Sequence, residues 1–239
     1  MKTGAFCVLF NDLHSGTLSG HGLLDDSEVF YVENRYRLFG WPGSGSFAVQ
    51  VALEEAGVRY DSIRVGREPS DREAFRRINP TGKVPALQLP DGTLLFESAA
   101  MLIHLADTHP LAHLAPASGS IEHARFLQWM VFLSANLYEA ALRIYYPQRY
   151  TIRAEADATA VRDQADIDFF AHLGLISQVL NPYVLGERYS VADVYLYMLA
   201  TWCHGDRSAM YERLPLIAKH ASLIAARPAV IKVEAEHAT

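Results

Sequence analysis

Residues 79–98 constrain the fold more than any other stretch, because two short apolar runs, a turn and a polar pair follow one another without a gap. The apolar runs at 84–89 and 93–96 have the length and composition of short strands. Between them, at 90–92, lies the sequence Pro-Asp-Gly, which tight turns favour. The segment therefore predicts an antiparallel hairpin.

A constrained residue begins the first strand of this hairpin, and polar residues follow its second strand. Pro85 lacks a backbone N–H and suits a strand start or an edge. Glu97 and Ser98 follow the second strand, where a helix is expected to begin with Ser98 as its cap. The free N–H groups of a helix N-terminus attract an anion, and Glu97 offers an acceptor for an ammonium group. This combination predicts a small-ligand site; the alternative is an ordinary surface hairpin.

The neighbouring segments complete an α/β pattern. Ser46 is placed to cap a helix that Gly57 ends. The sequence Ser-Asp-Arg-Glu at 70–73 predicts a capping box before another helix. The elements expected around the hairpin are strands at 36–39 and 60–65 and helices at 46–57, 70–79 and 98–107. Strand, helix, strand, helix, hairpin, helix is the thioredoxin-like order.

The second half of the chain has a different character. No strand-like alternation follows residues 109–120, where proline, serine and glycine indicate a domain boundary. Residues 1–34 have a loop-like composition. Helices are expected at 121–146, at 154–180, after a capping box at Ser190–Asp193, and over 214–228. We therefore expect an N-terminal extension at 1–34, an α/β domain at 35–109 and an all-helical domain at 120–239.

The hairpin, together with the strand Tyr-Arg-Leu-Phe at 36–39 ahead of a helix, resembles the glutathione-binding half of the glutathione S-transferase superfamily. The resemblance covers roughly residues 35–232. It implies an N-terminal thioredoxin-like α/β domain followed by an all-helical C-terminal bundle. It also implies that the capping box at Ser190–Asp193 starts a buried central helix, with a role in folding rather than in chemistry.

The same resemblance implies a glutathione site along the hairpin. The bond before Pro85 is expected to be cis, and the backbone of Val84 is expected to pair with the cysteinyl part of glutathione. The Glu-Ser pair at 97–98 is expected to hold the glutamyl end. The glutathione-binding residues implied are Lys83, Val84, Pro85, Glu97 and Ser98.

Glutathione chemistry needs the thiolate, and a thiol with an ordinary pKa of about 8.5 is only a few per cent ionised at neutral pH. The family places Tyr, Ser or Cys near the start of the first helix, where this chain offers Ser44 and Ser46. Alignment with the Cys-type bacterial branch puts Gly45 at the cysteine position, which argues against mixed-disulfide chemistry there. We predict that Ser44 and Ser46 jointly hold the thiolate. The alternatives are a plain helix cap for Ser46 and a solvated loop residue for Ser44.

Aromatic residues are candidates for lining an electrophile pocket. In the family the long helix faces the cleft, which implies this role for Trp129, Phe132 and Tyr138. Trp41, in the loop before the first helix, is a further candidate. Aromatic residues on a helix more often belong to the core, and a purely structural role is the alternative.

Charge and spacing exclude several functional classes. The formal net charge of −6 with interspersed signs argues against a nucleic-acid partner. The sequence contains no uninterrupted run of about 18 apolar residues, so no membrane-spanning helix is expected. Cys7 and Cys203 are far apart, which favours a reducing compartment and a cytoplasmic location. The spacing of His104, His109 and His113 does not form a metal-binding face, so no metal is expected.

These observations predict a glutathione transferase that activates the glutathione thiol for attack on a small hydrophobic electrophile, as in detoxification. Glutathione is the expected co-substrate, and the resemblance implies a homodimer. The alternative from another functional class is a binding or regulatory module that keeps the fold without turnover.

Overall fold

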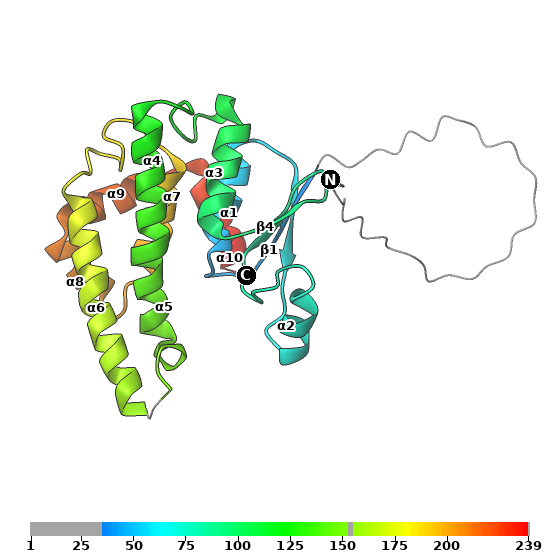
Figure 1. The fold of residues 1–239 in the computed structure, drawn as a ribbon. Coiled ribbons are helices and arrows are strands. Elements are labelled where there is room, and N and C mark those ends of the chain that lie inside the picture. Colours follow the sequence, from blue (N-terminus) through cyan, green and yellow to red (C-terminus); the bar gives the residue numbers. More distant parts are fainter. Residues whose placement is uncertain (1–34, 153–154, 239) are drawn as a thin grey trace, which may run out of the picture. The chain divides into compact units, whose positions relative to one another are not determined.

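The structure is a computed structural model that describes residues 35–152 and 155–238 (Figure 1). The extension expected at residues 1–34 lies outside the described part. The described residues belong to one compact unit, Val32–Thr239. That unit combines a four-stranded sheet with the helices that follow it.

The sheet has the strand order β2-β1-β3-β4 and mixed direction. Its strands are β1 (Tyr36–Gly40), β2 (Tyr60–Arg64), β3 (Ala86–Gln88) and β4 (Leu94–Phe96). Strand β1 runs parallel to β2 and antiparallel to β3, while β3 and β4 form the antiparallel hairpin that the sequence predicts. Ala86 pairs with Phe96, so Pro85 and Glu97 lie at the same end of the hairpin.

Three helices accompany the sheet and complete the predicted thioredoxin-like order. They are α1 (Ser46–Glu55), α2 (Pro69–Phe75) and α3 (Ser98–Thr108). Helix α1 contacts β1, α3, α7 and α10, and residues 46–53 are all buried. It ends before Gly57, which adopts a φ of 65° as a glycine after a helix commonly does.

The helix starts differ from the sequence prediction in two places. Gly45, not Ser46, is the N-cap of α1, and the Ser46 side chain makes no cap bond. Helix α2 begins at Pro69, with a capping box formed by Glu68 and Asp71 rather than by residues 70–73. Proline at the first helical position has a fixed φ and no N–H to satisfy, which moves the cap to the residue before it.

The chain after the sheet is helical. A single rod contains α4 (Ile121–Phe132), a π-helical turn η2 (Leu133–Tyr138) and α5 (Glu139–Tyr145), followed by α6 (Glu155–Ser177) (Figure 1). The remaining helices are α7 (Val191–Thr201), α8 (Arg207–Arg213), α9 (Pro215–Ala225) and α10 (Pro228–His237), with short 3-10 turns at Pro110–Ala112 and Pro147–Arg149. None of the described helices is long and apolar enough to cross a lipid bilayer.

Helix α7 is the centre of this helical region, and residues 191–200 are all buried. The predicted capping box at its start is confirmed: Asp193 accepts a hydrogen bond from the Ser190 N–H at 2.8 Å. The same carboxylate accepts from the Val184 N–H at 2.8 Å and lies 3.0 Å from His220 Nε2 of α9. Asp193 thus joins three segments of the bundle through one buried group.

Candidate functional site

The loop between β1 and α1 is tight because β1 ends directly against the first residue of α1. A Cβ added to Gly40 would lie 2.3 Å from the Cβ of Ser46, which leaves no room for a side chain at residue 40. The structure brings Ser44 and Ser46 together, with 2.9 Å between their hydroxyl oxygens. Both side chains are buried, with 8% and 3% of the residue surface exposed.

The two serine hydroxyls form hydrogen bonds within the loop. Ser44 Oγ donates to the Trp41 carbonyl at 2.7 Å, and Ser46 Oγ donates to the same oxygen at 3.2 Å. The Ser46 N–H in turn donates to Ser44 Oγ at 3.3 Å. A hydroxyl that holds a thiolate must donate its proton to sulfur, so either serine would first have to leave the Trp41 carbonyl.

Gly45 is the point where the loop, the hairpin and the long helix meet. A Cβ added at Gly45 would lie 2.8 Å from the Tyr138 hydroxyl and 3.2 Å from Cδ of Pro85. The phenol therefore occupies the space that a side chain at residue 45 would need. Tyr138 belongs to the π-helical turn η2, far away in the sequence.

Aromatic neighbours fix the ring of Tyr138. Trp202 packs edge-on at 5.1 Å between ring centroids, and Tyr195 lies at 6.2 Å. Burial raises the pKa of the Tyr138 phenol, and the nearby Tyr195, Glu97 and Tyr146 raise it further. The Tyr138 hydroxyl forms no hydrogen bond with any group in the described part of the chain.

The Val84-Pro85 peptide bond is cis, as the sequence prediction required. The buried Asn79 fixes the loop that precedes this bond. Its side-chain amide donates to the Lys83 carbonyl at 2.5 Å, and its Oδ1 accepts from the Thr81 N–H at 3.0 Å. The backbone N–H and carbonyl of Val84 form no hydrogen bond with any described residue. They remain available to an extended ligand, whereas the Lys83 side chain is exposed to solvent.

Glu97 has an unusual backbone conformation, with φ 71° and ψ 106°. It is the N-cap position of α3, so the prediction that Ser98 caps this helix is wrong. The Ser98 side chain is buried, and its hydroxyl lies 2.9 Å from the hydroxyl of the buried Tyr195 of α7. Non-glycine residues at positive φ cost energy and are common at ligand sites. The exposed Glu97 carboxylate, by contrast, can reach a ligand beside the free N–H groups of α3.

A pocket of about 270 Å³ adjoins the loop at Ser44. Its apolar lining comes from Phe47 of α1 and from Met198 and Trp202 at the end of α7, and its polar lining from Glu234 and His237 of α10. Sequence reasoning missed these residues. The three-and-four spacing of Met198, Thr201 and Trp202 along one helix face could have identified part of the pocket.

His237 connects α10 to the loop. Its Nε2 lies 2.9 Å from Oε1 of Gln50, and its Nδ1 accepts from the Gly43 N–H at 3.4 Å. Burial lowers the pKa of the His237 imidazole and so favours its neutral form, in which Nδ1 can accept a hydrogen bond. No simple sequence signal marks a residue so close to the C-terminus as a neighbour of this loop.

The other predicted aromatic residues lie away from Gly45. Trp129 and Phe132 pack against each other at 5.5 Å, and Phe132 also packs against His172 of α6 at 5.4 Å. Trp41 packs with a small apolar cluster on the α2 side and lies under Arg67 at 5.3 Å. Of the predicted electrophile-pocket residues, Tyr138 is the one whose side chain the structure places against Gly45.

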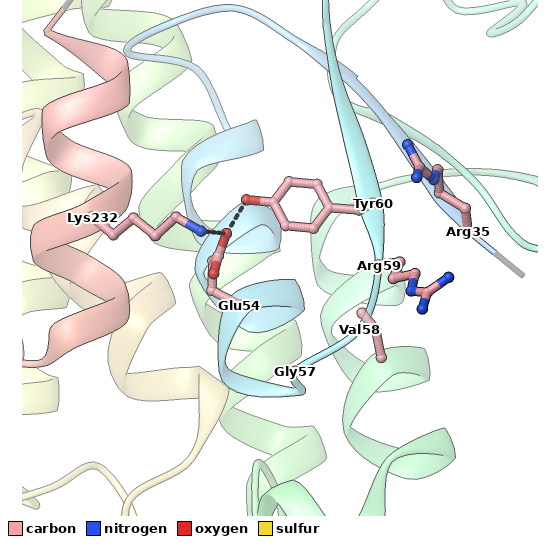
Figure 2. A pocket seen from close by; sticks show the side chains of 7 residues that line it. All are labelled: Arg35, Glu54, Gly57, Val58, Arg59, Tyr60 and Lys232. Atoms are coloured by element: carbon pink, nitrogen blue, oxygen red, sulfur yellow. Dashed lines mark hydrogen bonds and ion pairs between the residues drawn. The ribbon is translucent and has the colours of Figure 1, made fainter.

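A second pocket, of about 370 Å³, lies at the opposite end of α1 (Figure 2). In Figure 2 the Glu54 carboxylate accepts hydrogen bonds from the Tyr60 hydroxyl and from Lys232 Nζ, the latter at 2.6 Å. These groups satisfy one another and join α1, β2 and α10. We interpret this pocket as a structural contact, because the half-buried Glu54 carboxylate already has its hydrogen-bond partners.

The described residues offer little for metal or cysteine chemistry. No three His, Cys, Asp or Glu side chains among them form a group that could hold a metal ion. Cys203 is buried, and burial raises the pKa of its thiol, which disfavours the reactive thiolate. The polar side chains that the structure places at this loop are Ser44, Ser46, Tyr138 and His237.

Comparisons of the sequence and of the structure with known proteins point to the same family. Residues 46–108 match the family model for the glutathione S-transferase N-terminal domain. The glutathione S-transferase GstA of Escherichia coli O157:H7 is 28% identical over 199 residues, which cover 81% of this chain and 94% of the relative.

Two solved structures extend this likeness over the whole fold. A glutathione transferase homologue from Sulfitobacter with bound glutathione has a TM-score of 0.77 and 28% identity, and the match covers 85% of this chain and 98% of that chain. A sphingomonad glutathione S-transferase complexed with glutathione has a TM-score of 0.72 and 31% identity, with 84% and 98% covered. Fold, family model and near-complete coverage of these relatives together show that the chain belongs to the glutathione S-transferase superfamily.

Proposed function

We propose that this protein is a glutathione transferase that binds glutathione along the hairpin and activates its thiol near Gly45. The observation that carries the proposal is the convergence of the unpaired Val84 backbone, the Glu97 carboxylate and the start of α1. Glutathione is an extended peptide with an ammonium group at one end, a thiol in the middle and a carboxylate at the other end. Val84 would pair with its backbone and Glu97 with its ammonium group.

The reaction follows from the position of the thiol. The thiol proton is released to solvent, and the thiolate attacks an electrophilic carbon so that a carbon–sulfur bond forms. With a halide substrate the carbon–halogen bond breaks and the halide leaves with the bonding pair. With an epoxide or an unsaturated carbonyl, the resulting anion takes a proton from water.

The pocket beside Ser44 is our candidate for the electrophile site. Its volume of about 270 Å³ is just below the range typical of ligand pockets, about 300 to 1,000 Å³. Phe47, Met198 and Trp202 give it apolar walls next to the loop. These features favour a small hydrophobic electrophile, and detoxification of such compounds is the role that we propose.

A non-catalytic binding module is the second candidate. It is favoured by the hydrogen bonds of Ser44 and Ser46 to the Trp41 carbonyl, which occupy both loop hydroxyls. In a binding module, glutathione would bind with its thiol at an ordinary pKa.

Calorimetric titration with glutathione, followed by assays with halide, epoxide and unsaturated carbonyl electrophiles, tests the proposal. We expect saturable binding and glutathione-dependent turnover above the uncatalysed rate with at least one class. Binding without turnover across the panel would favour the binding module. Absence of binding at millimolar glutathione would exclude both candidates.

We also propose that the protein forms a homodimer through the β4 edge of the sheet. Strand β4 is an edge strand, and it exposes Leu94 and Phe96 with 38% and 45% of their surfaces accessible. Apolar side chains on an open edge favour association with another chain. Light scattering should give twice the monomer mass, and Phe96→Glu should shift it towards the monomer. A wild-type protein of monomer mass at micromolar concentration would contradict this assembly.

A further inference from the structure

The first helix starts with a glycine where a side chain would collide with a phenol. Gly45 has an ordinary helical backbone, with φ −59° and ψ −8°, so its conformation does not require glycine. The requirement comes from space, because an added Cβ would be 2.8 Å from the Tyr138 hydroxyl. The Tyr138 phenol therefore occupies the space that a side chain at residue 45 would fill.

The π-helical turn η2 explains how a residue of the long helix reaches this position. A π turn contains one more residue per hydrogen-bonded turn than an α-helix and so rotates the following side chains about the helix axis. Tyr138 is the last residue of this turn. Its ring is held by Trp202 and Tyr195, which leaves the hydroxyl end directed at Gly45.

We propose that the Tyr138 hydroxyl donates the hydrogen bond that stabilises the glutathione thiolate, in place of a side chain at position 45. The inference rests on the proposed function, since it requires glutathione to bind at this loop. Tyr138 would then be a catalytic residue supplied by the helical region rather than by the β1–α1 loop.

The electrostatics and the hydrogen bonds favour this assignment over the serines. Burial and the neighbouring Glu97, Tyr195 and Tyr146 raise the pKa of the Tyr138 phenol, so it keeps its proton at neutral pH and can donate to an anion. Its hydroxyl has no hydrogen-bond partner within residues 35–152 and 155–238. Ser44 and Ser46 both donate to the Trp41 carbonyl instead.

Tyr138→Phe tests the proposal, because it keeps the ring packing and removes the hydroxyl alone. We expect the pKa of the bound glutathione thiol, followed by thiolate absorbance in the ultraviolet, to rise by about 1 to 2 pH units, as for loss of one hydrogen bond to a charged group. Affinity for S-methylglutathione, which has no ionisable thiol, should stay unchanged. Tyr150→Phe is the matched control, since it removes an exposed phenol beyond α5 and should leave the thiol pKa as in the wild type.

Gly45→Ala provides a second test that does not alter Tyr138 itself. The added Cβ should displace the phenol and raise the thiol pKa, and combining it with Tyr138→Phe should give little additional change. The proposal is overturned if Tyr138→Phe binds glutathione with the same thiol pKa as the wild type, whatever the effect of Ser46→Ala. A wild type that does not bind glutathione would instead refute the proposed function, and this inference with it.

Discussion

Replacing Asp193 with alanine is expected to lower the free energy of unfolding by about 3 to 5 kcal/mol, the range for breaking a buried charged network. The carboxylate is fully buried and accepts from the backbone N–H groups of Ser190 and Val184, both at 2.8 Å. It also lies 3.0 Å from His220 Nε2. Removing it leaves three buried polar groups without a partner, and urea unfolding measures the loss.

Asp206→Ala is the matched control for this effect. Asp206 also caps a helix, since its carboxylate accepts from the Ser208 N–H at 2.8 Å, but the bond is exposed to solvent. Loss of an ordinary cap costs about 1 kcal/mol. Equal losses for Asp193→Ala and Asp206→Ala would show that the buried network contributes no more than a simple cap.

Replacing Glu97 with alanine is expected to weaken glutathione binding by about 10- to 150-fold, which corresponds to loss of one charge-assisted hydrogen bond. The carboxylate follows β4 at the N-terminus of α3, where the ammonium group of glutathione would be held. Glu97→Gln keeps the shape of the side chain and removes its charge, so its loss of glutathione affinity should be nearly as large as that of Glu97→Ala. Calorimetric titration gives the three dissociation constants.

Glu97→Gly separates the backbone effect from the side-chain effect. The φ of 71° is accessible to glycine, whereas alanine there bears a cost of about 1 kcal/mol or more. The glycine variant should therefore be more stable than the alanine variant while binding glutathione as weakly. If the alanine variant binds glutathione as tightly as the wild type, Glu97 does not hold the ligand.

Local patterns explain why much of the fold could be predicted from the sequence. The hairpin follows from two apolar runs around a Pro-Asp-Gly turn, and the end of α1 follows from Gly57. The capping box at Ser190–Asp193 is encoded within four residues. Each of these features depends on neighbours in the sequence, so a single chain is enough to predict it.

The arrangement around Gly45 could not be predicted in the same way, because it depends on tertiary contacts. Sequence patterns placed Tyr138 on a long helix but gave no sign of the π turn that directs its hydroxyl at Gly45. They also suggested that Ser46 is a helix cap, whereas its hydroxyl donates to the Trp41 carbonyl. The pocket at the end of α7 likewise arises from segments that meet only in the folded chain.

A crystal structure of the protein with bound glutathione tests the central claim most directly. We predict the cysteinyl backbone paired with Val84, the ammonium group at Glu97 and the sulfur within hydrogen-bonding distance of the Tyr138 hydroxyl. Glutathione bound elsewhere, or bound at the hairpin with its sulfur turned away from Gly45 and Tyr138, would contradict the account.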